Sequence, residues 1–150
     1  MSLQVGQVAP DFEVPDQNGN PISLSQFKGQ KIVLYFYPKD STPGCTAQAC
    51  DLRDHYNQFL SQGYVVLGVS TDTEKKHQSF IKKYDLPFPL LADTERQVHE
   101  AYDTWQLKKF MGREFMGTVR TTFIIDEHGK IADIINKVKT KEHSAQIISI

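Results

Sequence analysis

The sequence predicts an α/β protein, built as one mixed β-sheet with helices on both of its faces. Apolar residues fill two runs, KIVLYFY at 31–37 and YVVLGVS at 64–70, as expected of strands buried on both sides. Each run is followed by a segment with helical spacing of apolar residues, and strands joined through helices pair in parallel. Two later runs, at 121–126 and 130–136, are joined by the turn Glu127-His128-Gly129, which predicts an antiparallel hairpin.

Length and composition predict one domain, spanning residues 1–150. The chain is 39% hydrophobic and 23% charged, and its net charge of −1 gives no reason for binding to nucleic acid or to an anionic membrane. Its N-terminus lacks the basic and apolar segments of a targeting sequence, and no apolar run approaches the ~18 residues of a membrane-spanning helix. We therefore expect a cytoplasmic monomer whose partners are small molecules or proteins.

Two elements are predicted on either side of the first buried strand. Residues 10–30 hold short alternating segments around Asn18-Gly19, which is the sequence signal for a small N-terminal β-hairpin. Pro38 ends the strand at 31–37, because proline has no N–H to donate to a sheet ladder. A helix is then predicted from about Cys45 to Ser61, where apolar residues recur at helical spacing.

The middle of the chain continues the alternation of helices and strands. Thr71-Asp72-Thr73 offers N-caps for a helix that reaches about Tyr84. A short strand is predicted at 90–92, followed by a helix over about 95–102 that opens at Asp93 or Thr94. These elements complete the parallel part of the sheet.

Regular spacing fails at residues 103–119, which we interpret as a long loop or an irregular hairpin. Its large apolar side chains form either a small satellite core or an exposed surface that binds substrate or a protein partner: Trp105, Phe110, Met111, Phe115 and Met116. After the hairpin at 121–136, the segment SAQIISI predicts a short terminal helix.

The most informative stretch lies between the strand at 31–37 and the following helix, and reads PKDSTPGCTAQAC from Pro38 to Cys50. Ligands of open α/β sheets bind at this end of the strands. A thiol in the first turn of a helix is close to unpaired backbone N–H groups and to the positive end of the helix dipole, which stabilise a thiolate. Cys45 is therefore predicted to be a nucleophile, rather than a small buried hydrophobic residue.

The second cysteine, Cys50, follows at a spacing that is neither the CxxC of dithiol oxidoreductases nor a common zinc-ligand spacing. No metal is expected. If both cysteines are helical, their Cα atoms lie roughly 8 to 9 Å apart, beyond the ~7 Å limit of a disulfide. Cys50 can meet Cys45 only if the first turns of the helix unwind. The alternative is that Cys50 fills the inner face of the helix as a core residue.

Three further sets of side chains have ordinary structural interpretations. Thr42 is placed to cap the helix that follows it, and Arg120 could be a surface cation beside a strand. The five histidines show no metal-ligand spacing and no link to Cys45, so we interpret them as surface or cap residues: His55, His77, His99, His128 and His143.

The pattern Pro38-x-x-x-Thr42-x-x-Cys45 resembles the active-site signature of the peroxiredoxins. The longer string FYPKDSTPGCTAQACDLRD resembles the bacterioferritin comigratory protein (peroxiredoxin Q) subfamily, in which a resolving cysteine follows the peroxidatic one by five positions. The resemblance extends from APDFEVPDQNG to RTTFIIDEHGKI and implies a thioredoxin-like fold. The C-terminal helix looks shorter than is usual in that family.

The resemblance implies a role for five residues. Cys45 would be peroxidatic and Cys50 resolving, Thr42 would hydrogen-bond the thiolate and the peroxide, Pro38 would shield the pocket, and Arg120 would bring a guanidinium to the site. The implied substrate is hydrogen peroxide or an organic hydroperoxide, and the implied reductant is thioredoxin or a glutaredoxin-like dithiol protein. No cofactor is needed, because sulfur carries both electrons.

Two other functions remain open from the sequence. A thiol-disulfide oxidoreductase acting on proteins would share the fold, although it normally relies on CxxC. A redox-sensing or binding module would also keep the fold, and it would react only slowly with peroxide.

Overall fold

The computed structural model describes residues 3–148. A central five-stranded sheet has the order β5-β4-β3-β8-β9, in which β3 and β4 and then β4 and β5 pair in parallel. Strands β8 and β9 complete the sheet with antiparallel pairing. The mixed sheet predicted from the sequence is confirmed. Its strands are β3 (Lys31–Phe36), β4 (Tyr64–Ser70), β5 (Leu90–Ala92), β8 (Thr121–Ile125) and β9 (Ile131–Ile135).

Two small hairpins and the helices surround this sheet. The hairpins are β1 (Glu13–Pro15) with β2 (Pro21–Ser23) and β6 (Trp105–Phe110) with β7 (Arg113–Thr118). A short 3-10 helix, η1 (Leu24–Phe27), follows β2. The α-helices are α1 (Pro43–Asp54), α2 (Tyr56–Ser61), α3 (Glu74–Tyr84), α4 (Gln97–Ala101) and α5 (His143–Ile148).

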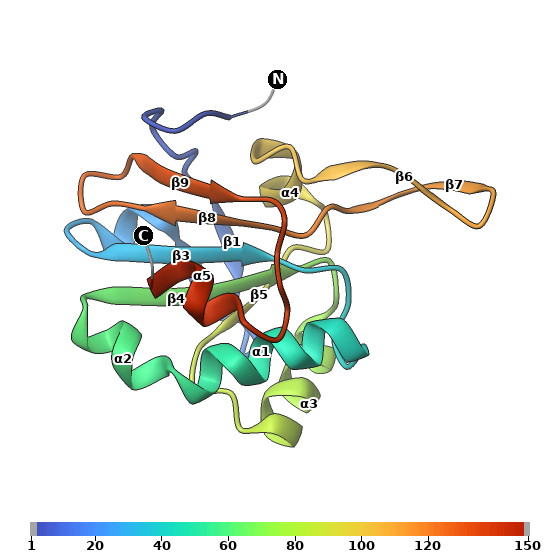
Figure 1. Ribbon diagram of the computed structural model, residues 1–150, viewed down its shortest axis with the longest axis horizontal. Coiled ribbons are helices and arrows are strands. Elements are labelled where there is room, and N and C mark those ends of the chain that lie inside the picture. Colours follow the sequence, from blue (N-terminus) through green and yellow to red (C-terminus); the bar gives the residue numbers. More distant parts are fainter. Residues whose placement is uncertain (1–2, 149–150) are drawn as a thin grey trace.

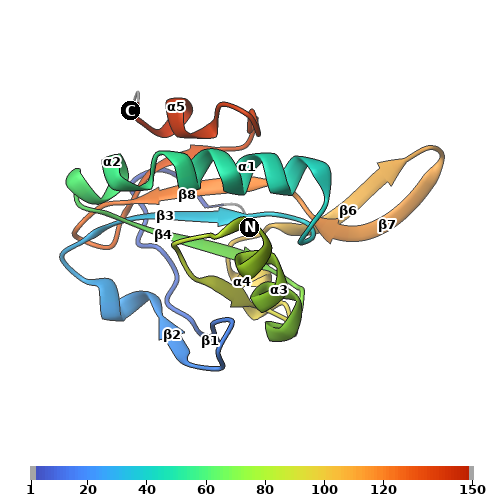
Figure 2. The same cartoon turned by 90° about the horizontal axis from the view of Figure 1, so that it is seen from below.

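The buried side chains form two clusters, one on each face of the sheet. Strand β3 divides its residues between them, since Val33 and Tyr35 enter one cluster while Leu34 and Phe36 enter the other. The Val33 cluster contains residues of α1, α2, α3 and α5, and the Leu34 cluster contains residues of α4 and the N-terminal hairpin. Figure 2 shows α1, α2 and α5 on one side of the sheet and the β1–β2 hairpin on the other.

Three predicted elements differ from the structure. The helix expected over 45–61 is interrupted at His55, where the backbone leaves helical geometry between α1 and α2. The helix α4 begins after Arg96, which has a positive φ, and Asp93 caps it from a distance by accepting hydrogen bonds from the N–H groups of Val98 and His99. Within residues 103–119, β6 and β7 form a regular antiparallel hairpin, in place of the long loop or irregular hairpin that was predicted.

The β6–β7 hairpin projects beyond the end of the sheet (Figure 1). Its large apolar side chains do not form a satellite core, because four of them are exposed: Phe110, Met111, Phe115 and Met116. Trp105, at the base of the hairpin, is half-buried and lies edge-on to His99. Backbone hydrogen bonds between β6 and β7 stabilise the hairpin. The Lys108 ammonium group also donates a hydrogen bond to the carbonyl of Thr118.

The interpretation of the histidines as surface or cap residues is wrong for three of the five. His77, His99 and His143 are fully buried, whereas His55 and His128 are exposed. Each buried imidazole has hydrogen-bond partners for both ring nitrogens: His77 with Asp40 and Leu91, His99 with Asp93 and Thr118, and His143 with Thr122 and Gln146. Each of these histidines has a partner at least 19 positions away in the chain, and sequence spacing gives no sign of such pairs: Asp40, Thr118 and Thr122.

Within residues 3–148, no helix is long and apolar enough to cross a membrane. The same part of the chain contains no group of three or more His, Cys, Asp or Glu side chains arranged to hold a metal ion.

Candidate active site

Cys45 lies in the first turn of α1, directly after the loop that leaves the carboxyl end of β3. The helix begins at Pro43, and its first backbone hydrogen bond runs from the N–H of Thr46 to the carbonyl of Thr42. The N–H groups of Gly44 and Cys45 therefore precede the intrahelical ladder and contribute to the positive end of the helix dipole. Cys45 is only 2% exposed, so its sulfur lies in a desolvated environment.

Arg120 reaches the thiol from the connection between β7 and β8. Its Nη2 lies 3.3 Å from the sulfur of Cys45, and its Nη1 donates a 2.6 Å hydrogen bond to Oε1 of Gln48. The two arms of the guanidinium thus hold two residues that lie one turn apart on α1. A fixed positive charge at this distance favours the thiolate over the thiol, and a planar group held at both ends cannot easily turn away.

Two residues near this contact were missed by the sequence analysis. Gln48 is fully buried and orients Arg120, but nothing in the sequence marks it as more than a polar helix residue. Gly44 leaves room for the guanidinium, since a Cβ atom there would lie 3.3 Å from Nη2 of Arg120. The Pro43-Gly44 pair before Cys45 is the one signal that could have drawn attention to this close approach.

Thr42 and Pro38 lie in the loop that carries the chain from β3 to α1. Thr42 occupies the N-cap position, yet its side chain makes no capping hydrogen bond; its hydroxyl donates to the carbonyl of Lys39 at 2.8 Å. Pro38 is half-buried and directly follows the buried Tyr37. The structure therefore brings Arg120 to Cys45 by direct contact, while Thr42 and Pro38 lie in the loop three and seven positions before Cys45 in the chain.

Cys50 lies on the same helix as Cys45, and both thiols are free. Cys50 is half-buried, so it does not fill a fully enclosed core position. Five residues of ideal helix separate the two Cα atoms by roughly 8 to 9 Å, which exceeds the reach of a disulfide, about 7 Å. The structure shows the reduced helix in which the two cysteines are held apart.

The residue after Cys50 is held by the C-terminal helix. Asp51 accepts a 2.7 Å hydrogen bond at Oδ2 from the N–H of Ser144, and its carbonyl accepts a 3.0 Å hydrogen bond from the Ser144 hydroxyl. The preceding residue, His143, attaches α5 to the sheet through a 2.7 Å hydrogen bond between Nε2 and the Thr122 hydroxyl. Figure 1 shows α5 lying beside α1.

Two tyrosines near the carboxyl end of β3 contribute to the buried cluster that contains Cys45. Tyr35 and Tyr37 stack with ring centroids 5.4 Å apart and share a buried cluster with Cys45. Burial, together with the neighbouring charges of Cys45 and Asp40, raises the pKa of Tyr35 well above its ordinary value, although Arg120 opposes the shift. Burial, Tyr35 and Asp40 raise the pKa of Tyr37 in the same direction. Both rings therefore remain phenols beside the thiol.

The AhpC/TSA family model matches residues 5–134 of the chain. The chain is also similar to Peroxiredoxin Bcp of Bacillus subtilis (strain 168), with 48% identity over 148 residues that cover 99% of this chain and 94% of that protein. These matches extend over β3, the loop with Pro38 and Thr42, α1 with both cysteines, and Arg120.

Solved structures agree with this family assignment. A crystal structure of a cysteine-to-serine mutant of PrxQ from Xylella fastidiosa superposes with a TM-score of 0.93 at 29% identity, covering 99% of this chain and 95% of that chain. The bacterioferritin comigratory protein of Xanthomonas campestris, described for its alkyl peroxide reduction activity, superposes with a TM-score of 0.90 at 31% identity and covers 97% of this chain and 96% of that chain. The predicted thioredoxin-like fold is thereby confirmed. The chain belongs to the AhpC/TSA family and is a peroxiredoxin, a thiol peroxidase, of the Bcp (peroxiredoxin Q) type.

Proposed function

We propose that this peroxiredoxin reduces hydrogen peroxide and organic hydroperoxides through Cys45, and that Cys50 resolves the oxidised sulfur as an intramolecular disulfide. The contact between Arg120 Nη2 and the Cys45 sulfur, 3.3 Å long, carries the proposal. The thiolate attacks the outer oxygen of the peroxide, the O–O bond breaks, and the leaving oxygen takes a proton to become water or an alcohol. Cys45 is left as a sulfenic acid, which condenses with the Cys50 thiol and releases water.

The remaining residues support this chemistry from the loop and from the helix. Arg120 stabilises the thiolate and offers N–H donors to the negative charge that develops on the peroxide oxygens. Thr42 contributes a hydroxyl that can rotate from the Lys39 carbonyl toward the substrate. Pro38 limits the access of water to the thiol from the loop side. The roles of these three residues are part of the proposal.

Resolution by Cys50 requires the first half of α1 to unwind. Gln48 lies between the two cysteines, and its buried Nε2 has no hydrogen-bond partner among the described residues. An unpaired buried donor costs about 1–3 kcal/mol, which is recovered when the donor returns to water. The unpaired Gln48 side chain therefore destabilises the reduced helix at the place where the helix must unwind. Beyond Cys50, the bonds of Asp51 to α5 hold the second half of the helix.

We further propose that thioredoxin or a glutaredoxin-like dithiol protein reduces the disulfide, and that the protein acts as a monomer in the cytoplasm. The exchange needs only a dithiol partner, because unwinding of α1 exposes both sulfurs.

Steady-state peroxide consumption tests the proposal, with wild type, Cys45→Ser and Cys50→Ser compared under thioredoxin and then glutaredoxin supply. We expect Cys45→Ser to lose all activity and Cys50→Ser to lose turnover with thioredoxin while keeping one turnover of peroxide. Full activity of Cys45→Ser would contradict the proposal. Rapid reduction of insulin disulfides with slow peroxide turnover would favour a protein oxidoreductase instead.

A further inference from the structure

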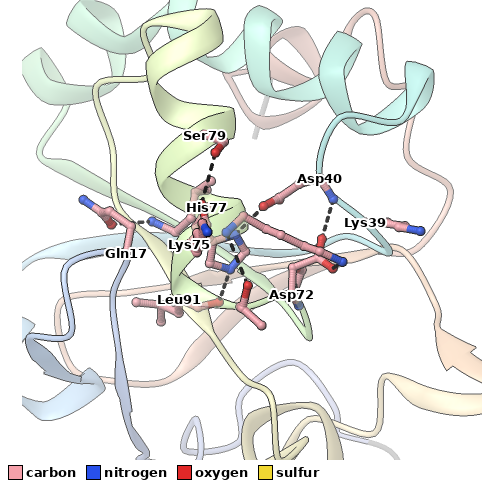
Figure 3. A network of polar contacts seen from close by, with 12 residues as sticks. Gln17, Lys39, Asp40, Asp72, Lys75, His77, Ser79 and Leu91 are labelled. Atoms are coloured by element: carbon pink, nitrogen blue, oxygen red, sulfur yellow. Dashed lines mark hydrogen bonds and ion pairs between the residues drawn. The ribbon is translucent and has the colours of Figure 1, made fainter.

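The loop between β3 and α1 is anchored by a buried carboxylate that the peroxidase chemistry does not itself use. Asp40 is 8% exposed, and its carboxylate meets two side chains: Oδ1 accepts a 2.5 Å hydrogen bond from the Tyr37 hydroxyl, and Oδ2 lies 2.6 Å from Nδ1 of His77. Its backbone N–H donates a 2.6 Å hydrogen bond to Oδ2 of Asp72. Figure 3 shows His77 between Asp40 and Leu91, with Asp72 on the other side of Asp40.

Hydrogen-bond geometry assigns the protons of this network. The carbonyl of Leu91 can only accept, so Nε2 of His77, 3.0 Å away, carries a hydrogen. Tyr37 donates, because burial and its neighbours keep it a phenol. The 2.6 Å contact between Nδ1 and the Asp40 carboxyl therefore contains one shared proton. Every polar atom of the Asp40 side chain then has a partner, and such fully paired buried networks are rigid.

The hydrogen bonds of Asp40 with Tyr37, His77 and Asp72, called the anchor below, fix the position from which the chain runs to Cys45. Ser41 has a φ of 64°, a left-handed conformation that is strained for a non-glycine residue and persists only where its surroundings impose it. Thr42 is extended, as required before Pro43, whose ring fixes its own φ. With these three residues restrained, the position of Asp40 decides where α1 begins and hence where Cys45 lies.

We propose that Asp40 and His77 are positioning residues for the peroxide reaction, an inference that rests on the proposed function of Cys45. His77 belongs to α3, and Asp72 lies between the end of β4 and the start of α3, so the contacts of Asp40 with these two residues attach the loop to a part of the chain that does not unwind with α1. The anchor keeps Pro38 and Thr42 in place around the thiol during reaction with peroxide. It also leaves the loop in place when the first half of α1 opens.

The test compares two rates in reduced protein: the second-order reaction of Cys45 with hydrogen peroxide, and its alkylation by iodoacetamide, which needs the thiolate but not the pocket. Asp40→Ala removes the anchor, and we expect its peroxide rate to fall about tenfold or more because misplacement by about 1 Å is costly. Its alkylation rate is expected to change by less than about threefold, since Arg120 and the helix end still favour the thiolate.

Asp40→Asn is the conservative variant. Its amide oxygen can accept from Tyr37 and its amide N–H can donate to Nδ1 of a neutral His77, so every hydrogen bond is kept. We expect its peroxide rate to remain within about threefold of wild type if positioning is what Asp40 provides. His77→Gln breaks the link from the α3 side and is expected to lower the peroxide rate in the same direction as Asp40→Ala, which covers the case in which Asp40→Ala does not fold.

Ile131→Ala is the matched control for lost stability. Ile131 is buried at the other end of the sheet, in the cluster on the face away from Cys45, and truncating it leaves a cavity that destabilises the fold. We expect it to lower stability in urea but to leave the peroxide rate unchanged. The assignment is wrong if a folded Asp40→Ala or His77→Gln reacts with peroxide at the wild-type rate, or if Ile131→Ala loses as much of that rate. Wild-type protein whose Cys45 does not react with peroxide would overturn the proposed function as well.

Discussion

Arg120 acts on Cys45 with one arm of its guanidinium and on Gln48 with the other, and this division gives the residue two separable contributions. A positive charge near the sulfur is enough to favour the thiolate. Two separately directed N–H groups are needed to contact both the Cys45 sulfur and Gln48. Because the protein exposes Arg120 only partly, both contributions operate with little screening by water.

Substitution of Arg120 separates charge from geometry. We expect Arg120→Gln to lower the second-order rate constant with peroxide by about 10²-fold or more, the usual effect of removing a donor from a developing negative charge. Arg120→Lys keeps the charge but not the two-armed contact, so its rate constant should lie between those of Arg120→Gln and wild type. Stopped-flow oxidation of Cys45 measures both, and equal rate constants for Arg120→Lys and wild type would show that the contact with Gln48 has no catalytic role.

Gly44 offers a test in which stability and activity change in opposite directions. A Cβ atom at this position would lie 3.3 Å from Nη2 of Arg120 and would push the guanidinium from its place. Gly44→Ala should raise the free energy of unfolding by about 0.5–1 kcal/mol, because alanine is the better helix former, and should lower the peroxide rate constant several-fold. Urea unfolding and stopped-flow oxidation check the two effects; an unchanged rate constant would show that Arg120 has room to move.

At the scale of elements, the site depends on three anchors that each contain a buried histidine. His77 fixes the loop before α1, and His143 brings α5 to the sheet beside Asp51. His99 accepts or donates at Thr118, two residues before Arg120, and its other nitrogen bonds Asp93 at 2.7 Å. The part of α1 that must unwind, between Cys45 and Cys50, is thus fixed both before and after it. The end of β7, which precedes Arg120, is fixed separately by His99.

The contact between α5 and α1 should control how easily α1 opens. Ser144→Ala removes the hydroxyl bond to the Asp51 carbonyl, and we expect it to lower stability by about 0.5–1.5 kcal/mol. Amide hydrogen exchange in residues 43–54 should become faster, and the disulfide should form more quickly after a peroxide pulse. Unchanged exchange and disulfide formation would show that α5 does not restrain the helix.

His143 gives the attachment of α5 a defined pH dependence. Burial is the main cause that lowers the pKa of His143 from 6.5, opposed by its hydrogen bond to Gln146 and by Asp51, while Arg120 adds to the lowering. The folded state thus binds this proton less readily than the unfolded chain. Its stability contribution is complete above about pH 6.5 and is lost as the pH falls toward the lowered folded value, with a slope of at most about 1.4 kcal/mol per pH unit.

Urea unfolding between pH 5 and pH 8 checks this sign. His143→Gln has no titrating ring, so we expect its stability to fall less steeply than that of wild type below pH 6.5. An identical slope in the two proteins would show that His143 does not account for the acid sensitivity.

The projecting β6–β7 hairpin should contribute little to global stability. Phe110 is 67% exposed and Phe115 is 46% exposed, so replacing both with Ser is expected to change the free energy of unfolding by less than about 0.5 kcal/mol each. Chemical denaturation measures this, with Phe123→Ala as the buried control, for which a loss of about 3–5 kcal/mol is expected. A large loss in the Phe110 and Phe115 variant would mean that the hairpin packs against the body in solution.

At the scale of the whole molecule, the features that the sequence predicted are those that depend on the local pattern of apolar and turn-forming residues. The buried runs at 31–37 and 64–70 became β3 and β4, and Cys45 lies in the first turn of a helix as its position after Thr42-Pro43-Gly44 indicated. The break at His55 was not predicted, because the apolar spacing continues across it. The regular pairing of the hairpin at 105–118 was not predicted either, and an irregular hairpin was only one of two interpretations, since the alternating side chains are exposed on both faces and give no period-two signal.

Long-range polar contacts account for most of what the sequence did not reveal. Asp40 and His77 lie 37 positions apart, and Asp51 and Ser144 lie 93 positions apart. No local pattern relates such pairs, because the sheet topology alone brings β3, β4, β8 and the C-terminal helix to one place. Arg120 was named through resemblance to a family, and its partner Gln48 was visible only in the folded protein.

Peptide mapping of protein treated with one equivalent of hydrogen peroxide tests the central claim most directly. We expect wild type to yield a single Cys45–Cys50 disulfide within one chain, and Cys50→Ser to yield Cys45 as a sulfenic acid that a dimedone probe captures. The same treatment should leave Cys45→Ser unmodified at Cys50. Oxidation of Cys50 in Cys45→Ser at the wild-type rate, or a wild-type product in which Cys45 remains a free thiol, would contradict the account.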